Sequence, residues 1–249
     1  MKKVLMISYY WPPSGGPGVQ RILKFCKYLP DFGWEPIVLT VKHGEFPSID
    51  ESLILESASI RVYYAKAISP YNLYKLFSKS KRIQTYQLSP KENEPTFNRF
   101  ARWIRYNMVI PDGRIGWYPD AVRLGLSIIK NEKIDLIFSS GPPHTSHLIG
   151  RKLTKCTGMK WTADFRDPWT DRFYYSESPR NRLTQWFDRV LEKKVLDDAD
   201  RISVVSQGFF DQLDCHTPIK DKTKIIFNGF DEEDFKDMAI HNRGNDNFV

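Results

Sequence analysis

The apolar positions of this chain of 249 residues alternate between short continuous runs and helical stripes. Apolar runs at 4–8 and 36–41 predict buried strands, because a strand covered on both faces is apolar at successive positions. The segment between them carries a helical stripe formed by Val19, Ile22, Leu23, Cys26 and Leu29. A strand, a helix and a second strand in this order predict a βαβ unit with a parallel sheet.

The same alternation continues toward the end of the chain. Further strands are predicted at 61–65, 135–139, 161–165, 202–205 and 224–227. Helices are predicted at 118–131, 145–157 and 180–196. About seven parallel strands with helices between them indicate an α/β fold with a Rossmann-like, doubly wound, mostly parallel sheet.

Two segments depart from this alternation. Residues 66–98 are polar and basic with no clean period, so we expect an irregular basic insertion there, followed by a helix at 98–109. The tail at 237–249 is polar and typical of a linker between domains. We therefore expect one domain at 1–236, with the start of an interdomain linker after it and a second domain beyond.

Charge narrows the classes of partner. The net charge is +7, which favours anionic partners such as phosphorylated small molecules or lipid headgroups. Between Lys75 and Arg105, eight basic and two acidic residues give a local net charge of +6, with aromatic residues interleaved. Such a segment can lie on an anionic membrane, or it can be a solvated loop with a packed helix. No recognised nucleic-acid-binding motif accompanies the charge, so no nucleic-acid partner is expected.

The cysteines and the amino terminus indicate the compartment. The three cysteines, Cys26, Cys156 and Cys215, are far apart and have no metal-ligand spacing. We expect neither a disulfide framework nor a bound metal, and a reducing cytoplasmic location. The first apolar run is too short for a signal peptide or a membrane span.

Chemistry is expected where strands end, because ligands of open parallel sheets bind at the carboxyl ends of the strands. Gly15, Gly16 and Gly18 follow the first strand and lead into a helix, so backbone N–H groups can approach a phosphate closely. Arg21, one turn into that helix, faces either this loop or solvent. The spacing is not G-x-G-x-x-G and no acidic residue ends the second strand, which argues against a dinucleotide dehydrogenase. A tight turn without a ligand is the alternative.

Other strand ends carry further candidates. His144 follows the strand at 135–139, where it could contact a substrate hydroxyl or serve only the loop. The most charged strand end contains Asp164, Arg166, Asp167 and Trp169, close to Asp171 and Arg172. Paired Arg and Asp side chains can orient a phosphate or sugar hydroxyls, or they can brace a loop. After the last two strands, Ser206, Asn228 and Gly229 are further candidates for the acceptor side of the cleft. Ser206 could also cap a helix, and Asn228-Gly229 could form a tight turn.

Five motifs in order resemble the amino-terminal domain of the subfamily-4-like retaining GT-B glycosyltransferases. They are KVLMISYYWPP at 3–13 with Gly15-Gly16, DLIFSSGPPH at 135–144, DFRDPW at 164–169, DADRISVVS at 198–206 and NGFD at 228–231. The third is similar to the family's Asp-x-Arg-Asp-x-Trp signature. The resemblance implies one half of a GT-B fold, whose partner domain holds a nucleotide-sugar donor.

The resemblance also implies roles. Gly15 and Gly16 would approach the donor diphosphate, His144 would lie near the transferred sugar, and Asp164, Arg166, Asp167 and Trp169 would shape the acceptor side. The reaction would retain anomeric configuration and need no metal or other cofactor, only the nucleotide-sugar as co-substrate. A glycan or lipid-linked acceptor in cell-surface polysaccharide or lipopolysaccharide synthesis would suit an enzyme at the inner face of the cytoplasmic membrane.

Two further expectations concern this chain alone. Without a donor-binding domain, we expect the chain by itself to be inactive. The alternative is a stand-alone nucleotide- or phosphosugar-binding module without catalysis.

Overall fold

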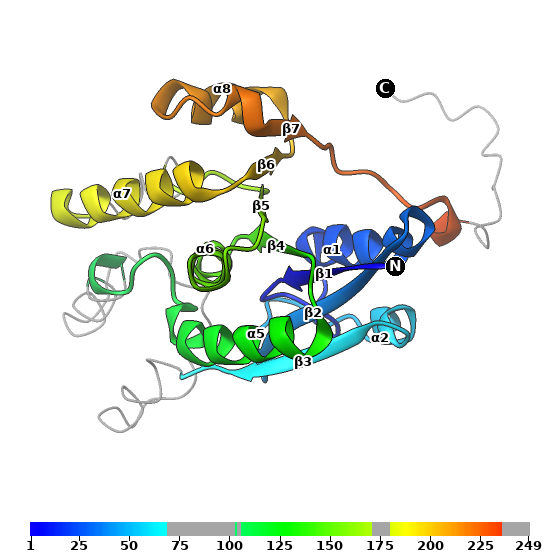
Figure 1. The fold of residues 1–249 in the computed structure, drawn as a ribbon. Helices are drawn as coiled ribbons and strands as arrows, with labels where there is room; N and C mark the ends of the chain where they lie inside the picture. The colour runs from blue at the N-terminus through cyan, green and yellow to red at the C-terminus, as the bar shows by residue number, and fades with distance from the viewer. Residues whose placement is uncertain (69–102, 104–105, 171–179, 236–249) are drawn as a thin grey trace, which may run out of the picture.

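The computed structural model describes residues 1–68, 103, 106–170 and 180–235 (Figure 1). Within them, seven parallel strands form one sheet in the order β3-β2-β1-β4-β5-β6-β7. The strands are β1 (Lys2–Ile7), β2 (Trp34–Lys42), β3 (Arg61–Lys66), β4 (Leu136–Gly141), β5 (Trp161–Phe165), β6 (Arg201–Val204) and β7 (Thr223–Ile225). The seven strands predicted from the apolar runs, and the Rossmann-like parallel sheet, are confirmed.

Helices connect the strands as expected. They are α1 (Pro17–Tyr28), α2 (Ser52–Ser57), α5 (Tyr118–Glu132), α6 (Thr145–Thr157), α7 (Arg182–Asp198) and α8 (Gln207–His216). Short 3-10 turns are η1 (Leu29–Phe32), η2 (Ile115–Trp117), η4 (Lys220–Lys222) and η5 (Glu232–Phe235). The expected insertion at 66–98 and linker at 237–249 lie almost wholly outside the described residues. Of the helix expected at 98–109, the described positions 103 and 106–108 are helical.

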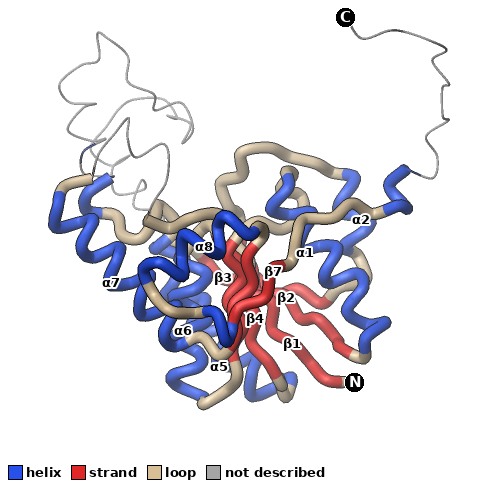
Figure 2. Tube along the Cα trace, turned by 90° about the horizontal axis from the view of Figure 1, so that it is seen from above, coloured by secondary structure: helices blue, strands red, loops and turns tan. Residues whose placement is uncertain are grey.

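Alternate residues of each strand face two separate helical layers. On β1, Leu5 and Ile7 join the core formed with α5, α6, α7 and α8, whereas Val4 and Met6 join the core formed with α1 and α2. Figure 2 shows the two layers on opposite sides of the strands. Many of the aromatic residues serve these cores: the fully buried side chains include Trp11, Trp117, Trp161 and Trp169.

The strand order fixes where a ligand can bind. The chain moves outward from β1 to β2 and β3, then returns to place β4 on the other side of β1. At this reversal the connections after β1 and β4 leave toward opposite faces, and in open α/β sheets the crevice between them holds the ligand. The loops at 8–16 and 142–144 border that crevice.

After β7 the chain crosses back toward α1 (Figure 1). Asp231 anchors this segment: its carboxylate lies 2.7 Å from Lys27 Nζ and accepts a hydrogen bond from Tyr28 Oη at 2.7 Å. Although burial raises the pKa of Asp231, hydrogen bonds from Lys27, Tyr28 and Lys24 hold it below its ordinary value. The last described turn, η5, is therefore fixed beside α1.

Candidate functional site

A row of polar side chains crosses three neighbouring strands on the face that α1 covers. Ser140 of β4, Asp164 of β5 and Ser203 of β6 stand at the same register position. The carboxylate of Asp164 accepts hydrogen bonds from Ser140 Oγ at 2.8 Å and from Ser203 Oγ at 2.6 Å. All three side chains are buried, so the row is a polar strip inside an apolar layer.

Arg21 of α1 supplies the countercharge. Its Nη2 and Nε donate to the two carboxylate oxygens of Asp164 at 2.9 and 3.2 Å. Its Nη1 donates to Phe227 O at 3.3 Å and to Asn228 Oδ1 at 3.1 Å. The side chains of Arg21 and Asp164 are 3% and 0% exposed. A buried ion pair is tolerated only when its remaining hydrogen-bonding groups are satisfied, as they are here.

This pairing corrects two expectations. Arg21 faces neither the glycine loop nor solvent, because the buried carboxylate of Asp164 draws its guanidinium under the strand ends. Asp164, expected on the acceptor side of the cleft, lies beneath that surface. Both residues are buried and therefore position the site from below its surface.

The glycine loop is held from one side and open on the other. Gly15 N donates to Ser48 O at 3.1 Å, and Asp50 N donates to Pro13 O at 2.8 Å. Gly16 is the exposed N-cap of α1 with φ of 101°, a conformation that disfavours any residue with a side chain. Helix α1 has no side-chain cap and no acidic residue in its first turn. Its partial positive charge therefore has no anionic side chain within that turn.

Arg166 adds a full positive charge at the same place. Its guanidinium lies so close to Gly18 that a Cβ there would collide with Nη1. Its Nη2 donates to Pro142 O, and its backbone N donates to Gly141 O at 3.0 Å. Among the described residues it has no ion-pair partner, and burial lowers its pKa. A guanidinium and a helix N-terminus thus converge at the β1–β4 crevice, where both favour an anion.

His144 lies in an aromatic stack below this surface. Its ring stacks on Trp169, with centroids 4.7 Å apart and planes tilted by 11°. Both side chains are buried, and Trp169 Nε1 donates to Asp188 Oδ1 at 3.4 Å. Because the His144 side chain is fully buried, it has no exposed surface for a sugar in this structure. Trp169 supports the loop by packing, without a face of its own toward a ligand.

The remaining candidates lie at the edge of the crevice or beyond it. Asp167 is exposed. Ser206 caps α8 as expected, since its Oγ accepts from Phe209 N at 3.3 Å. Asn228 and Gly229 are exposed and form no turn; instead Asn228 is fixed by Arg21. Asp171 and Arg172 lie outside the described residues.

The N-terminus of α6, by contrast, is already occupied. Asp112 accepts from Thr145 N at 3.0 Å and from Thr145 Oγ1 at 2.8 Å. An internal carboxylate thus takes the place that an anionic ligand could take. Of the two helix N-termini at the crevice, only that of α1 is free of an acidic side chain in this part of the structure.

His147, one turn along α6, was missed from the sequence. It is fully buried, stacks on Phe165 with centroids 4.3 Å apart, and pairs through Nδ1 with Ser139 Oγ at 2.9 Å. Ser139 Oγ also accepts from Trp161 Nε1 at 2.9 Å, so Trp161, Ser139 and His147 form one buried hydrogen-bonded chain. Burial lowers the pKa of His147 to about 3. The sequence could have pointed to His147 through its position three residues after His144.

Within the described residues, no group of three or more His, Cys, Asp and Glu side chains could hold a metal ion. The expectation of a metal-free site stays a prediction.

Two solved structures share this fold over most of the chain. The chain superposes on HepE (Alr3699) of Anabaena, crystallised with UDP and glucose, with a TM-score of 0.53 at 14% identity, covering 94% of this chain and 46% of HepE. It superposes on sucrose-phosphate synthase of Thermosynechococcus elongatus with a TM-score of 0.56 at 16% identity, covering 94% of this chain and 49% of the synthase. The chain therefore has the Rossmann-like fold of one GT-B half and spans about half the length of these proteins.

The sequence itself gives the family. Residues 71–234 match Glycosyltransferase Family 4, so the chain belongs to that family, as its motifs predicted. No match was found among curated protein sequences.

The buried state of His147 predicts a specific pH dependence of stability. The unfolded state binds a proton at the ordinary histidine pKa of 6.5, whereas the folded state does not do so until about pH 3. Between these values the unfolded state holds one more proton, so the free energy of unfolding falls by about 1.4 kcal/mol per pH unit on acidification. Denaturant titrations should show that the free energies of unfolding of the parent and of His147→Gln change equally with pH above pH 7. Below pH 6 the parent should lose stability more steeply, and equal slopes there would contradict the assignment.

Proposed function

We propose that this chain is the acceptor-side domain of a glycosyltransferase and that its β1–β4 crevice receives the diphosphate of a nucleotide-sugar. The observation that carries this proposal is the convergence of the α1 N-terminus and the half-buried Arg166 at the β1–β4 crevice. Charge that develops on a departing diphosphate is stabilised by such fixed donors and cations. Gly16 leaves open space for a phosphate beside the backbone, and Gly18 leaves the space that the Arg166 guanidinium fills.

The donor class follows from chemistry and from the similar proteins. HepE was crystallised with UDP-glucose. The diphosphate of a sugar nucleotide is an anion of the kind that a helix N-terminus and a guanidinium favour. Because the chain spans about half of HepE, the nucleotide and sugar contacts would come from a second domain facing the crevice. We infer transfer of a sugar to a glycan or lipid-linked acceptor with retention of configuration and without a metal.

A stand-alone nucleotide- or phosphosugar-binding module remains the alternative. Such a module must enclose its ligand with its own residues. Here Gly16 and Pro17 are exposed at the outer edge of the loop, which suits a site completed by another domain. Micromolar binding of a nucleotide-sugar to this chain alone would favour the module; the transferase proposal expects much weaker binding.

The role of Arg166 gives the most direct test of this proposal. In a protein that joins this chain to its donor-binding domain, Arg166→Gln should lower kcat about 10²-fold or more, because one preorganised cation is lost from the diphosphate. Arg201→Gln, which removes an exposed arginine at the amino end of β6, is the matched control and should keep full activity. Transfer of labelled sugar measures both, and NMR of the product gives its anomeric configuration. Unchanged turnover in a folded Arg166→Gln protein would refute the assignment.

We further infer that the domain rests on an anionic membrane and meets a lipid-linked acceptor there. The basic stretch that first suggested this lies almost wholly outside the described residues, but α7 offers independent support. Leu183, Trp186 and Phe187 are 64%, 55% and 42% exposed and share one side of the helix. Arg182 and Arg189 are exposed beside them.

The acidic residues in this part of α7 are not placed to repel an anionic membrane, because they are buried. Asp188 and Glu192 are buried, and Asp188 is paired with Arg180. The outward face at 182–189 therefore combines aromatic and basic side chains without an exposed carboxylate, as interfacial helices do. No helix in the described parts of the chain is long and apolar enough to span a membrane.

Vesicle binding tests the membrane inference. The chain should co-sediment with vesicles containing phosphatidylglycerol at low salt, and Trp186→Ser/Phe187→Ser should reduce the bound fraction at least fivefold, because buried apolar area is lost. Phe32→Ser/Leu55→Ser removes two residues that are 79% and 83% exposed elsewhere and should leave binding unchanged. Equal losses in both variants, or no binding by the parent, would overturn the inference.

A further inference from the structure

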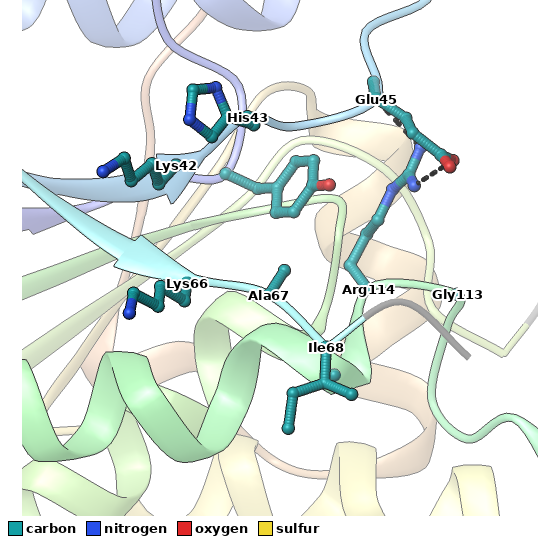
Figure 3. Close-up of a pocket in the computed structure, with 10 residues that line it drawn as sticks. Lys42, His43, Glu45, Lys66, Ala67, Ile68, Gly113 and Arg114 are labelled. Carbon is teal, nitrogen blue, oxygen red and sulfur yellow. Dashed lines mark hydrogen bonds and ion pairs between the residues drawn. The ribbon is translucent and has the colours of Figure 1, made fainter. Parts of the chain in front are cut away.

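A second cavity lies at the carboxyl ends of β1, β2 and β3, away from the β1–β4 crevice (Figure 3). Its volume is about 460 Å³, within the range of small-molecule sites. The lining residues are Tyr9, Lys42, His43, Glu45, Lys66, Ala67, Ile68, Gly113, Arg114 and Gly116. Tyr9 lies two residues after β1, in the loop that leads to Gly15. The same loop therefore borders both the cavity and the β1–β4 crevice.

Two lysines stand side by side at the edge of this cavity. Lys42 and Lys66 are the last residues of β2 and β3 and stand at the same register position. Their side chains extend in the same direction, away from Arg114 and Glu45 (Figure 3), and both are exposed. Neither ammonium group has an ion-pair partner among the described residues. Like charges directly across a strand pair repel, so this arrangement is stabilised by an anion between them.

The carboxylate of Asp120, which lies beside Lys66, already has hydrogen-bond and ion-pair partners. Asp120 accepts from the backbone N of Lys66 at 2.7 Å and forms an ion pair with Arg123 at 2.7 Å. Hydrogen bonds from the Lys66 backbone and from Arg123 lower the pKa of Asp120. Asp120 thus fixes the end of β3 and interacts with the charge of Lys66 electrostatically, without forming an ion pair with its ammonium group.

The opposite wall is rigid. The guanidinium of Arg114 lies 5.0 Å from the ring centroid of Tyr9 and donates to Glu45 Oε2 at 2.8 Å and Glu45 O at 3.1 Å. Tyr9 is 3% exposed, so its ring forms a fixed floor under Arg114. Three cations and one carboxylate line the cavity, which gives a net charge of +2 with His43 neutral.

We propose that this cavity binds an anionic group of the acceptor, a phosphate or a carboxylate, held by Lys42 and Lys66. The proposal rests on the proposed function, which assigns the donor diphosphate to α1 and Arg166 and leaves this cavity to the acceptor. The lysine pair favours an anion over a neutral sugar, because an ammonium group binds a charged oxygen more strongly than a hydroxyl. The acceptor class is therefore a phosphorylated glycan or lipid carrier, or an acidic sugar.

Amide chemical shifts of the ¹⁵N-labelled chain test this with four probes: inorganic phosphate, glucuronate, glucose and UDP. Phosphate or glucuronate should shift the amides of Lys66, Ala67 and Arg114 saturably, and glucose should not. Lys42→Gln/Lys66→Gln should weaken that binding about tenfold, because charge-assisted hydrogen bonds are lost. Lys130→Gln/Lys194→Gln removes two exposed lysines elsewhere and should leave it unchanged.

The outcomes separate the possible sources of the anion and the two proposals. A response to phosphate alone assigns a phosphorylated acceptor, and a response to glucuronate alone assigns an acidic sugar. Glucose binding as tightly as glucuronate, no anion response, or UDP displacing phosphate at these amides would overturn the acceptor assignment. The activity loss in Arg166→Gln is independent of these shifts, so the transferase proposal can stand or fall separately.

Discussion

The buried ion pair between Arg21 and Asp164 is the constraint on which the site depends. Removing two charges from water costs several kcal/mol per ion, and the cost is recovered only if hydrogen-bonding geometry is kept. Here that geometry needs Ser140 from β4, Ser203 from β6 and the Asn228 region, as well as α1 and β5. Displacing any of these elements leaves a buried charge poorly paired, so they hold one arrangement.

Because of this ion pair, two neighbouring arginines, Arg21 and Arg166, have different roles. Arg21 is neutralised inside the domain and fixes α1 against the sheet. Arg166, two residues after Asp164, reaches the N-terminus of α1 and has no ion-pair partner among the described residues. The first arginine makes the helix N-terminus a fixed point, and the second gives that point a net positive charge. The proposed diphosphate site would use both, because donors fixed in advance need no reorganisation when charge develops on the ligand.

The sheet could be predicted because buried parallel strands are continuously apolar and each helix between them carries a stripe; α2, with six residues, is too short to show one. The glycine loop and the DFRDPW segment could likewise be placed at strand ends. What could not be predicted is tertiary. The partner of Asp164 depends on how α1 packs over β5, and the lysine pair depends on the register between β2 and β3. The burial of His144 depends on its stack with Trp169, which no spacing encodes.

A double-mutant cycle on Arg21 and Asp164 tests the central claim most directly. Unfolding free energies would be measured for Arg21→Met, Asp164→Asn and the double variant. Each single change should cost about 3–5 kcal/mol, because it leaves the other group buried without its partner. The double variant should cost clearly less than the sum of the two, with a coupling of at least about 1 kcal/mol. Additive losses, or single losses below about 1 kcal/mol, would show that the pair does not hold α1 and the strand ends together.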